Sequence, residues 1–84
     1  KTFKIYPNPT SDFINIDLAK GHNLSDLRLF NINGELLIES DVKSRSHVKL
    51  NVSNLQSGIH ILILSNDGSS SKSSIVRKLI ITNE

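Results

Sequence analysis

The sequence predicts an all-β protein, a small antiparallel two-sheet β-sandwich of immunoglobulin-like type with about seven strands. Its aliphatic residues are 11 Ile, 11 Leu and 4 Val against a single Ala, and β-branched side chains suit a pleated sheet. Short apolar segments recur at roughly ten-residue spacing, separated by Asn, Ser and Gly, which favour turns. No segment carries a sustained apolar stripe at helical spacing.

The first half of the chain divides into four expected strands. Residues 3–6 form a short strand that stops at Pro7, and residues 13–18 alternate cleanly between apolar and polar side chains. Residues 24–32 carry apolar side chains on one face and a charged side chain on the other. Residues 35–40 are expected to fold back against them as the second strand of a hairpin.

Two glycine dipeptides mark breaks between these segments. Asn33-Gly34 precedes the fourth strand, and both residues adopt positive φ values more readily than most, so a type I′ hairpin turn is expected. Ser57-Gly58 is expected to break the chain before the sixth strand. We expect Gly34 and Gly58 to be required by the backbone and to influence recognition through the fold.

Three further strands are expected in the second half. Residues 48–52 alternate, and residues 59–65 are apolar on both faces apart from His60, as is typical of a central strand. Residues 75–82 form the last strand. The Ser-rich run 68–74 between them is expected to be a flexible loop tip.

The composition argues against several classes of function. A chain of 84 residues has room for one small core, and a deep active-site cavity would remove part of it. The absence of Cys excludes a disulfide scaffold, a thiolate zinc site and a thiol nucleophile. The formal net charge is +2 and the basic residues are scattered, so no nucleic-acid partner is expected. No apolar run is long enough to span a membrane, so no membrane insertion is expected either.

The sequence also lacks the motifs of common catalytic, metal-binding and phosphate-binding sites. The sequence contains no G-x-S-x-G elbow, H-E-x-x-H motif, EF-hand loop or phosphate-binding glycine loop. We therefore expect no catalytic, metal-binding or cofactor-binding residues. His60 lies in an apolar strand, where a satisfied, partly buried side chain is expected rather than a general base. The separated Asp residues are expected to form turns, with a surface Ca²⁺ site as the less favoured alternative.

Three stretches of the sequence form an ordered set. The first is Ile-Tyr-Pro-Asn-Pro-Thr at residues 5–10, followed by Asp-Phe-Ile-Asn-Ile at 12–16. The second is Leu-Phe-Asn-Ile-Asn-Gly-Glu-Leu-Leu at 29–37, and the third is Val-Ser-Asn-Leu-Gln-Ser-Gly-Ile-His at 52–60, which leads to Arg-Lys-Leu-Ile-Ile at 77–81. In order and spacing they resemble the C-terminal sorting domain of type IX secretion system cargo, also called the Por secretion system C-terminal domain.

The resemblance implies that residues 1–84 are a single, independently folded C-terminal domain, excised from a larger cargo protein. Such a domain is a secretion signal that directs its cargo across the bacterial outer membrane and has no enzymatic activity. Its partners would be the type IX translocon and shuttle components, the upstream cargo domain, and a surface sortase that removes the domain as its substrate. The expected location is the periplasm in transit, then the outer-membrane surface or the extracellular space.

Recognition by this machinery is expected to use residues from all three stretches. Pro7 and Pro9 lack N–H donors, so their segment is expected to stay extended, to leave the sheet ladder and to form a defined junction between cargo and sandwich. The alternative is a plain turn leading into the sandwich. The residues expected to carry recognition are Tyr6, Pro7, Asn8, Pro9, Asn33, Gly34, Leu55, Gly58, Val76, Lys78 and Ile80.

The last strand offers a second mode of recognition. Its core-facing side chains are expected to be Ile75, Leu79 and Ile81. Val76, Lys78 and Ile80 would then lie on the opposite side, on a face or edge that can pair with a receptor by strand addition or flat contact. An uncovered edge would also allow weak self-association at high concentration. Ordinary packing of a central strand explains the same pattern.

The sequence departs from the family pattern at several positions. His60 stands where an aromatic residue is common, Asn31 where Asp is frequent, and Glu35 where a basic residue often follows the hairpin glycine. Two other functions stay open: a non-catalytic adhesive or carbohydrate-binding sandwich retained on a surface protein, and a structural spacer. A sugar site needs exposed flat aromatic rings, and the chain has no Trp, one Tyr and three Phe.

Overall fold

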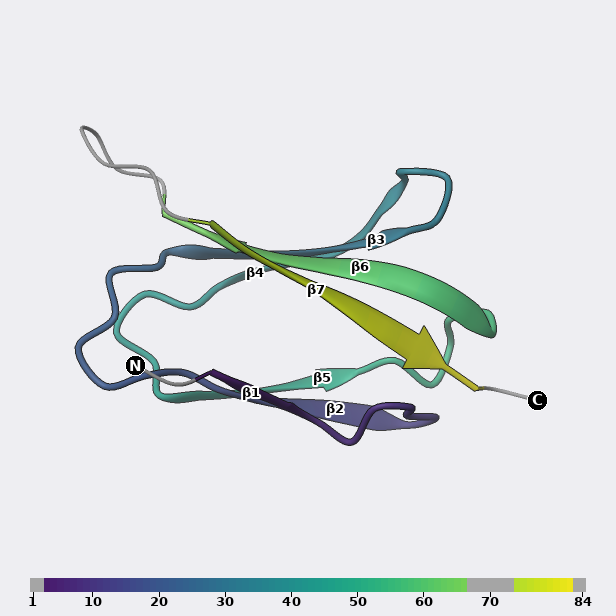
Figure 1. Cartoon of the computed structure of the whole chain (residues 1–84), viewed down its shortest axis with the longest axis horizontal. Coiled ribbons are helices and arrows are strands. Elements are labelled where there is room, and N and C mark those ends of the chain that lie inside the picture. Colours follow the sequence, from purple (N-terminus) through teal and green to yellow (C-terminus); the bar gives the residue numbers. More distant parts are fainter. Residues whose placement is uncertain (1–2, 67–73, 83–84) are drawn as a thin grey trace.

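The computed structural model is a sandwich of two β-sheets and describes residues 3–66 and 74–82 (Figure 1). Within these residues every element is a strand, which confirms the predicted fold class. The seven expected segments all form, with boundaries shifted by one or two residues. The strands are β1 (Lys4–Tyr6), β2 (Phe13–Asp17), β3 (Asp26–Asn31), β4 (Leu36–Asp41), β5 (His47–Asn51), β6 (Gly58–Ser65) and β7 (Ser74–Ile81).

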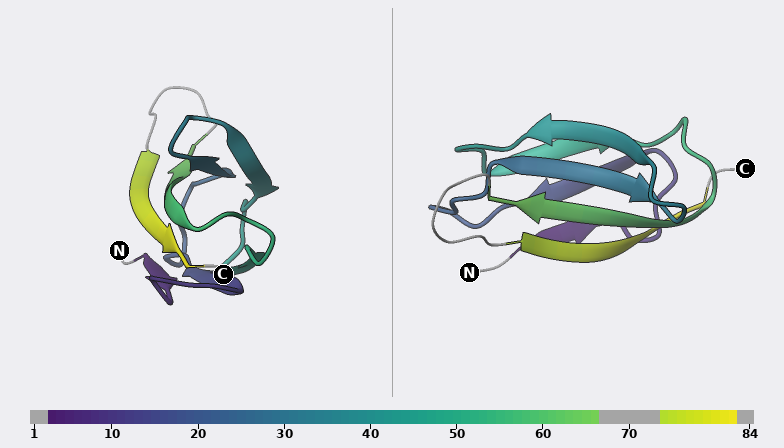
Figure 2. Two further views of the ribbon diagram at one scale, coloured as in Figure 1. Left: turned by 90° about the vertical axis from the view of Figure 1, so that its right-hand side faces the viewer. Right: turned by 90° about the horizontal axis from the view of Figure 1, so that it is seen from above.

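The strands divide into a three-stranded sheet in the order β1-β2-β5 and a four-stranded sheet in the order β4-β3-β6-β7. All strand pairs are antiparallel. The two sheets lie face to face, as the two turned views show (Figure 2). β6 lies inside the four-stranded sheet, as predicted. β7 is an edge strand, which agrees with the edge interpretation of its sequence pattern and not with the central one.

Alternate side chains fill the space between the sheets, as the period-two pattern predicts. Ile14 and Ile16 of β2 are fully buried, and Leu79 and Ile81 of β7 are buried opposite them while Ile75 packs at the margin. Fully burying one such side chain stabilises the fold by about 1.5–3 kcal/mol. The buried apolar residues are Ile14, Ile16, Leu18, Leu24, Leu27, Leu29, Val42, Val48, Leu50, Val52, Leu62, Leu64, Leu79 and Ile81.

The hairpin between β3 and β4 forms where it was predicted, but its turn is not type I′. Gly34 N donates to Asn31 O (3.0 Å), and Gly34 has a φ of 87°. Type I′ also requires a positive φ at Asn33, and Ser44 is the one non-glycine residue in the described ranges that has one. Gly34 is the left-handed fourth residue of the turn, and Asn31 N donates to Glu35 O (3.0 Å), which is the geometry of a glycine bulge.

The segment after β1 bonds to the outer edge of β7, and we call this arrangement the Asn8 clasp. The Asn8 side chain accepts from Ile80 N (3.0 Å) and donates to Lys78 O (3.2 Å). Thr10 continues the pairing, donating to Ile80 O (3.0 Å) and accepting from Thr82 N (2.8 Å). The clasp therefore links the three-stranded sheet to the edge of the four-stranded sheet by hydrogen bonds across about seventy residues of chain.

The structure confirms some of the predictions made for the connecting segments and contradicts others. β1 ends at Tyr6, before Pro7, as predicted, and both X–Pro bonds of the segment are cis. Gly58 was predicted to be a break and instead begins β6, with a φ of 139°. The Ser-rich run at 68–74 falls outside the described residues except for Ser74, which begins β7.

Replacement of Asn8 by Ala should lower the free energy of unfolding by about 1–2 kcal/mol, because each of its two hydrogen bonds contributes about 0.5–1.5 kcal/mol. Asn8→Asp keeps the acceptor for Ile80 N and loses the donor to Lys78 O, so its loss should be intermediate. Urea unfolding of the chain measures both. Asn23→Ala, at an exposed position in a loop, is the matched control and should change the free energy by less than about 0.5 kcal/mol. Equal losses at Asn8 and Asn23 would contradict the clasp.

Replacement of Gly34 by Ala should cost about 1 kcal/mol, because a Cβ disfavours the left-handed conformation that Gly34 adopts. An added Cβ would meet no atom within 4 Å, so the cost comes from the backbone and not from a clash. Gly34→Asn should cost less than Gly34→Ala, since Asn tolerates this conformation better. Thermal unfolding of the three chains tests the order, and Asn proving worse than Ala would refute the assignment.

Candidate functional site

Three connecting segments gather at one end of the sandwich, which we call the hairpin end: residues 7–12, 31–35 and 52–57. They follow β1, β3 and β5, and β7 finishes beside them (Figure 1). Thr10 bridges to Ile81, and Val52 N donates to Asp12 O (2.8 Å), so backbone bonds join residues 7–12 both to β7 and to residues 52–57. β1 begins at Lys4 at the opposite end. The three sequence stretches of the resemblance therefore converge in space.

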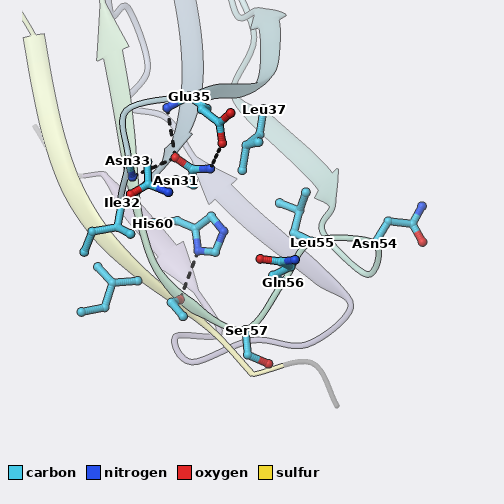
Figure 3. Close-up of a pocket in the computed structure, with 12 residues that line it drawn as sticks. Asn31, Ile32, Asn33, Glu35, Leu37, Asn54, Leu55, Gln56, Ser57 and His60 are labelled. Carbon is cyan, nitrogen blue, oxygen red and sulfur yellow. Dashed lines mark hydrogen bonds between the residues drawn. The ribbon is translucent and has the colours of Figure 1, made fainter.

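A groove of about 360 Å³ lies at this end, between the β3–β4 turn and the loop that leads into β6. Glu35 on the turn side and Leu55 and Gln56 on the loop side form its walls (Figure 3). His60 stands between them near the middle of the view, below Asn31 and above Ser57. The groove thus combines one carboxylate, several amides and an imidazole with apolar side chains, a composition suited to contacting a polypeptide surface.

His60 is the most buried polar side chain of the groove, with an exposed fraction of 3%. Its Nδ1 donates to Gly58 O (3.1 Å), and no described residue bonds to Nε2. Within the described residues, no fully buried side-chain nitrogen or oxygen lacks a hydrogen bond. Nε2 therefore remains accessible from the groove. A satisfied, partly buried histidine was predicted: the bond is confirmed at Nδ1, the side chain is more deeply buried than expected, and Nε2 can accept a bond from a partner.

Asn31 organises the turn side of the groove. Its Oδ1 accepts from Asn33 N (2.9 Å) and from Glu35 N (3.0 Å), and its Nδ2 donates to Glu35 Oε1 (2.6 Å). These bonds hold the turn and aim the Glu35 carboxylate. Sequence reasoning noted Asn31 as a departure from the family and missed this role. The available signal was an Asn at the first position of a turn, where its side chain bonds the backbone that follows.

Leu55 and Gly58 shape the loop side. Leu55 is half-buried and packs against the core, and its N–H donates to Val52 O (3.1 Å) in a tight turn. Gly58 holds the positive φ with which the chain enters β6. Asn51 supports the same loop, because its Oδ1 accepts from Ser53 N (2.9 Å). Leu55 and Gly58 therefore contribute to the groove mainly by holding in place the loop that forms one of its walls.

The structure divides the predicted recognition residues into two neighbouring groups and one outlier. The groove group comprises Asn33, Leu55 and Gly58, and Gly34 lies beside Asn33 in the same turn without lining the groove. The clasp group comprises Tyr6, Pro7, Asn8, Pro9, Lys78 and Ile80, of which Asn8 contacts the last two directly. Val76 stands apart, farther back along β7, and is 54% exposed.

Tyr6 and Phe13 are the exposed aromatic residues of the three-stranded sheet. The Tyr6 hydroxyl donates to Asp17 Oδ2 (3.1 Å), and this bond raises the pKa of Tyr6 above its usual value of 10.0. The Lys49 ammonium lies 4.4 Å from the centre of the Phe13 ring. That ring face is engaged by a cation and is not free to stack on a sugar.

The described residues contain neither a cluster of metal-ligating side chains nor a membrane-spanning helix. Among them, no three His, Asp or Glu side chains lie close enough together to hold a metal ion. The same residues include no helix of the length and apolarity needed to cross a membrane. The groove and the clasp at the hairpin end are accordingly the features on which a functional interpretation rests.

The comparison with protein families agrees with this geometry. A family model described as a secretion system C-terminal sorting domain matches residues 4–82. No curated protein matches the chain. The matched region contains all seven strands, the groove and the clasp. On this match over nearly its whole length, the chain belongs to the family of type IX secretion system C-terminal sorting domains.

Proposed function

We propose that this domain works as a folded address label, which the type IX translocon and its shuttle components read without any bond being made or broken by the domain itself. The family match over residues 4–82 is the observation that carries this proposal. Membership of the family means export toward the outer membrane or the extracellular space. The upstream cargo domain would be passive in recognition, and the sorting domain would supply the surface that is read.

The hairpin end is the surface best suited to be read. The three family stretches meet there, and the groove offers polar side chains beside exposed apolar ones. β1 starts at the other end of the sandwich, so a cargo domain joined before Lys4 would leave the hairpin end uncovered. A signal that must be recognised while attached to cargoes of many shapes needs this separation between the attachment point and the contact surface.

The clasp would contribute a second element of the same surface. Asn8 and Thr10 occupy the backbone groups of β7 at Lys78 and Ile80, so strand addition at this part of the edge would require the clasp to open. Flat contact is therefore the mode we propose for Lys78 and Ile80. Tyr6, Pro7 and Pro9 would act by holding Asn8 in place.

Mutation of the groove should separate recognition from folding. Gln56 is exposed and lines the groove, and Asn23 is exposed at the opposite end of the sandwich. Residues 1–84 are fused behind a reporter that carries its own leader, in a bacterium with a type IX system. Gln56→Arg should reduce export of the reporter roughly tenfold, which corresponds to about 1.4 kcal/mol of lost binding. The matched change Asn23→Arg should leave export unchanged.

The measurement is the division of reporter among periplasm, cell surface and medium, with circular dichroism confirming that both variants fold. A strain without the translocon gives the background. Equal export of the two variants would refute the hairpin end as the surface that is read. Periplasmic retention of the unsubstituted fusion, under conditions in which an established sorting domain exports the same reporter, would refute the sorting function itself.

Removal of the domain by a surface sortase is a separate proposal, supported by family membership. The mature surface protein should then lack residues 1–84. Mass spectrometry of peptides from surface-exposed parent protein checks this, with the periplasmic form as a control in which peptides of the domain are present. Retention of those peptides at the surface would contradict removal and would favour a module that stays on its protein.

A further inference from the structure

The groove at the hairpin end presents hydrogen-bond acceptors from both of its walls and from the histidine between them. Glu35 stands on the turn side, Gln56 stands on the loop side, and His60 is the most deeply buried of the three (Figure 3). His60 lies opposite Asn31 of β3 and alternates along β6 with the inward-facing Leu62. Its side chain therefore lies where the space between the two sheets opens at this end of the molecule.

The ring of His60 offers an acceptor to this space. Its Nδ1 lies 3.1 Å from Gly58 O, and a carbonyl oxygen can only accept, so Nδ1 carries the proton of the neutral ring. Nε2 then keeps a lone pair, and no described residue bonds to it. The side chain is only 3% exposed, and a buried polar atom needs a partner. A ligand that fits the groove must therefore donate a hydrogen bond to Nε2.

Glu35 gives the groove its charge. It is the one Asp, Glu, Lys or Arg among the residues that line the groove. Its Oε1 accepts from Asn31 Nδ2 (2.6 Å), which holds the carboxylate in place, and no other described residue bonds to this carboxylate. An ionised carboxylate accepts hydrogen bonds and donates none. The groove therefore selects a cation that donates hydrogen bonds.

Apolar side chains flank these acceptors. Leu37 on the turn side is 37% exposed, and Leu55 on the loop side packs against the core. The groove has a volume of about 360 Å³, at the lower end of the range of about 300–1,000 Å³ found for ligand pockets. It suits one long side chain, with an aliphatic stem against the leucines and a polar head at the acceptors.

A guanidinium group matches this arrangement better than an ammonium group. Arg carries five N–H donors in a planar fork and has no acceptor, so different N–H groups can reach Glu35 and His60 at the same time. A Lys ammonium is a compact and strongly hydrated point charge, which matches acceptors on separate elements less well. Hydrogen bonds between a guanidinium and a carboxylate are also strong, because both groups are charged.

We propose that the groove binds the side chain of an arginine that a partner protein presents on its surface. The guanidinium donates to the free oxygen of Glu35 and to Nε2 of His60, and the amide oxygen of Gln56 accepts a further bond. The aliphatic stem lies against Leu37 and Leu55. The inference rests on the proposed function in one respect, since the partner would be the component of the export machinery that reads the hairpin end.

A titration followed by NMR tests the site, with the blocked peptide acetyl-Gly-Arg-Gly-amide added to the isotope-labelled chain. The peptide should bind with a dissociation constant on the order of 1 mM and should shift the signals of His60 and Gln56. A peptide with citrulline in place of Arg has nearly the same shape without the charge and should bind about tenfold more weakly. A peptide with Lys should also bind more weakly than the Arg peptide.

Three results of the titration would overturn the proposal. The first is the absence of saturable shifts at concentrations up to about twenty times the expected dissociation constant. The second is equal binding of the citrulline peptide, which would show that charge is not recognised. The third is equal binding of the Lys peptide, which would show that the planar fork of the guanidinium is not recognised.

Variants on both walls locate the contact. Glu35→Gln keeps an acceptor for Asn31 and removes the charge, so it should weaken binding of the Arg peptide about tenfold. Glu39→Gln, at an exposed position of β4 outside the groove, is the matched control and should bind normally. Gln56→Arg leaves the turn untouched and should abolish binding, because it places a like charge in the groove. Amide spectra verify that each variant folds.

The comparison between these variants decides the location. Normal binding by Glu35→Gln or by Gln56→Arg would overturn the site, because each change alters a group assigned to the guanidinium. An equal loss in Glu35→Gln and in Glu39→Gln would do the same, since it would indicate attraction to negative charge anywhere on the surface.

Export of the reporter fusion separates this inference from the proposed function. The Glu35→Gln fusion should be exported about tenfold less than the unsubstituted fusion, and the Glu39→Gln fusion should be exported normally. Normal export of the Glu35→Gln fusion would overturn the arginine contact in recognition and leave the sorting function intact. Periplasmic retention of the unsubstituted fusion would overturn the sorting function and the export machinery as partner, while the titration still decides whether the groove binds a guanidinium.

Discussion

The arrangement of the hairpin end depends on one set of hydrogen bonds, those that join the turn after β1 to the outer edge of β7. Asn8 presents an amide that bonds as a peptide group would, accepting from Ile80 N and donating to Lys78 O, and Thr10 extends the pairing. Side-chain packing and the connecting loops also hold the two sheets together at this end, and the clasp adds directed hydrogen bonds between them. Because the clasp fixes the turn against β7, it also fixes the neighbouring loop through the bond from Val52 N to Asp12 O.

Asparagine performs the same task in three places around the hairpin end. Asn8 bonds the edge of β7, Asn31 accepts from two backbone N–H groups of its turn, and Asn51 accepts from Ser53 N. A short amide side chain can satisfy backbone groups that no strand reaches, which suits a surface built from turns. The groove is therefore bounded by loops held by hydrogen bonds, and His60 presents Nε2 between two such walls. A small domain obtains a defined contact surface in this way without enlarging its core.

The sequence predicted the strands well and the site incompletely, for reasons that individual residues make clear. Alternation in residues 13–18 and in the last strand identified the buried side chains correctly, because period two is a local property of a strand. The type I′ turn was wrong because Asn31, outside the dipeptide considered, captures the backbone of the turn. The groove and the clasp could not be predicted, since both depend on strand order. The apolar side chains on both faces of β6 predicted a strand that is covered on both sides. In the fold one of these faces lies on the outside of the four-stranded sheet.

The clasp also imposes an order on biosynthesis. Asn8 is made among the first residues of the domain and its partners Lys78 and Ile80 among the last, so ribosomes must finish nearly the whole domain before the contact can form. Such distant contacts form late because the chain between them must first be organised. A polypeptide cut short before β7 would lack both the edge strand and the assembled hairpin end. Synthesis through β7 thereby becomes a precondition for assembling the hairpin end, and products that stop before β7 would lack it.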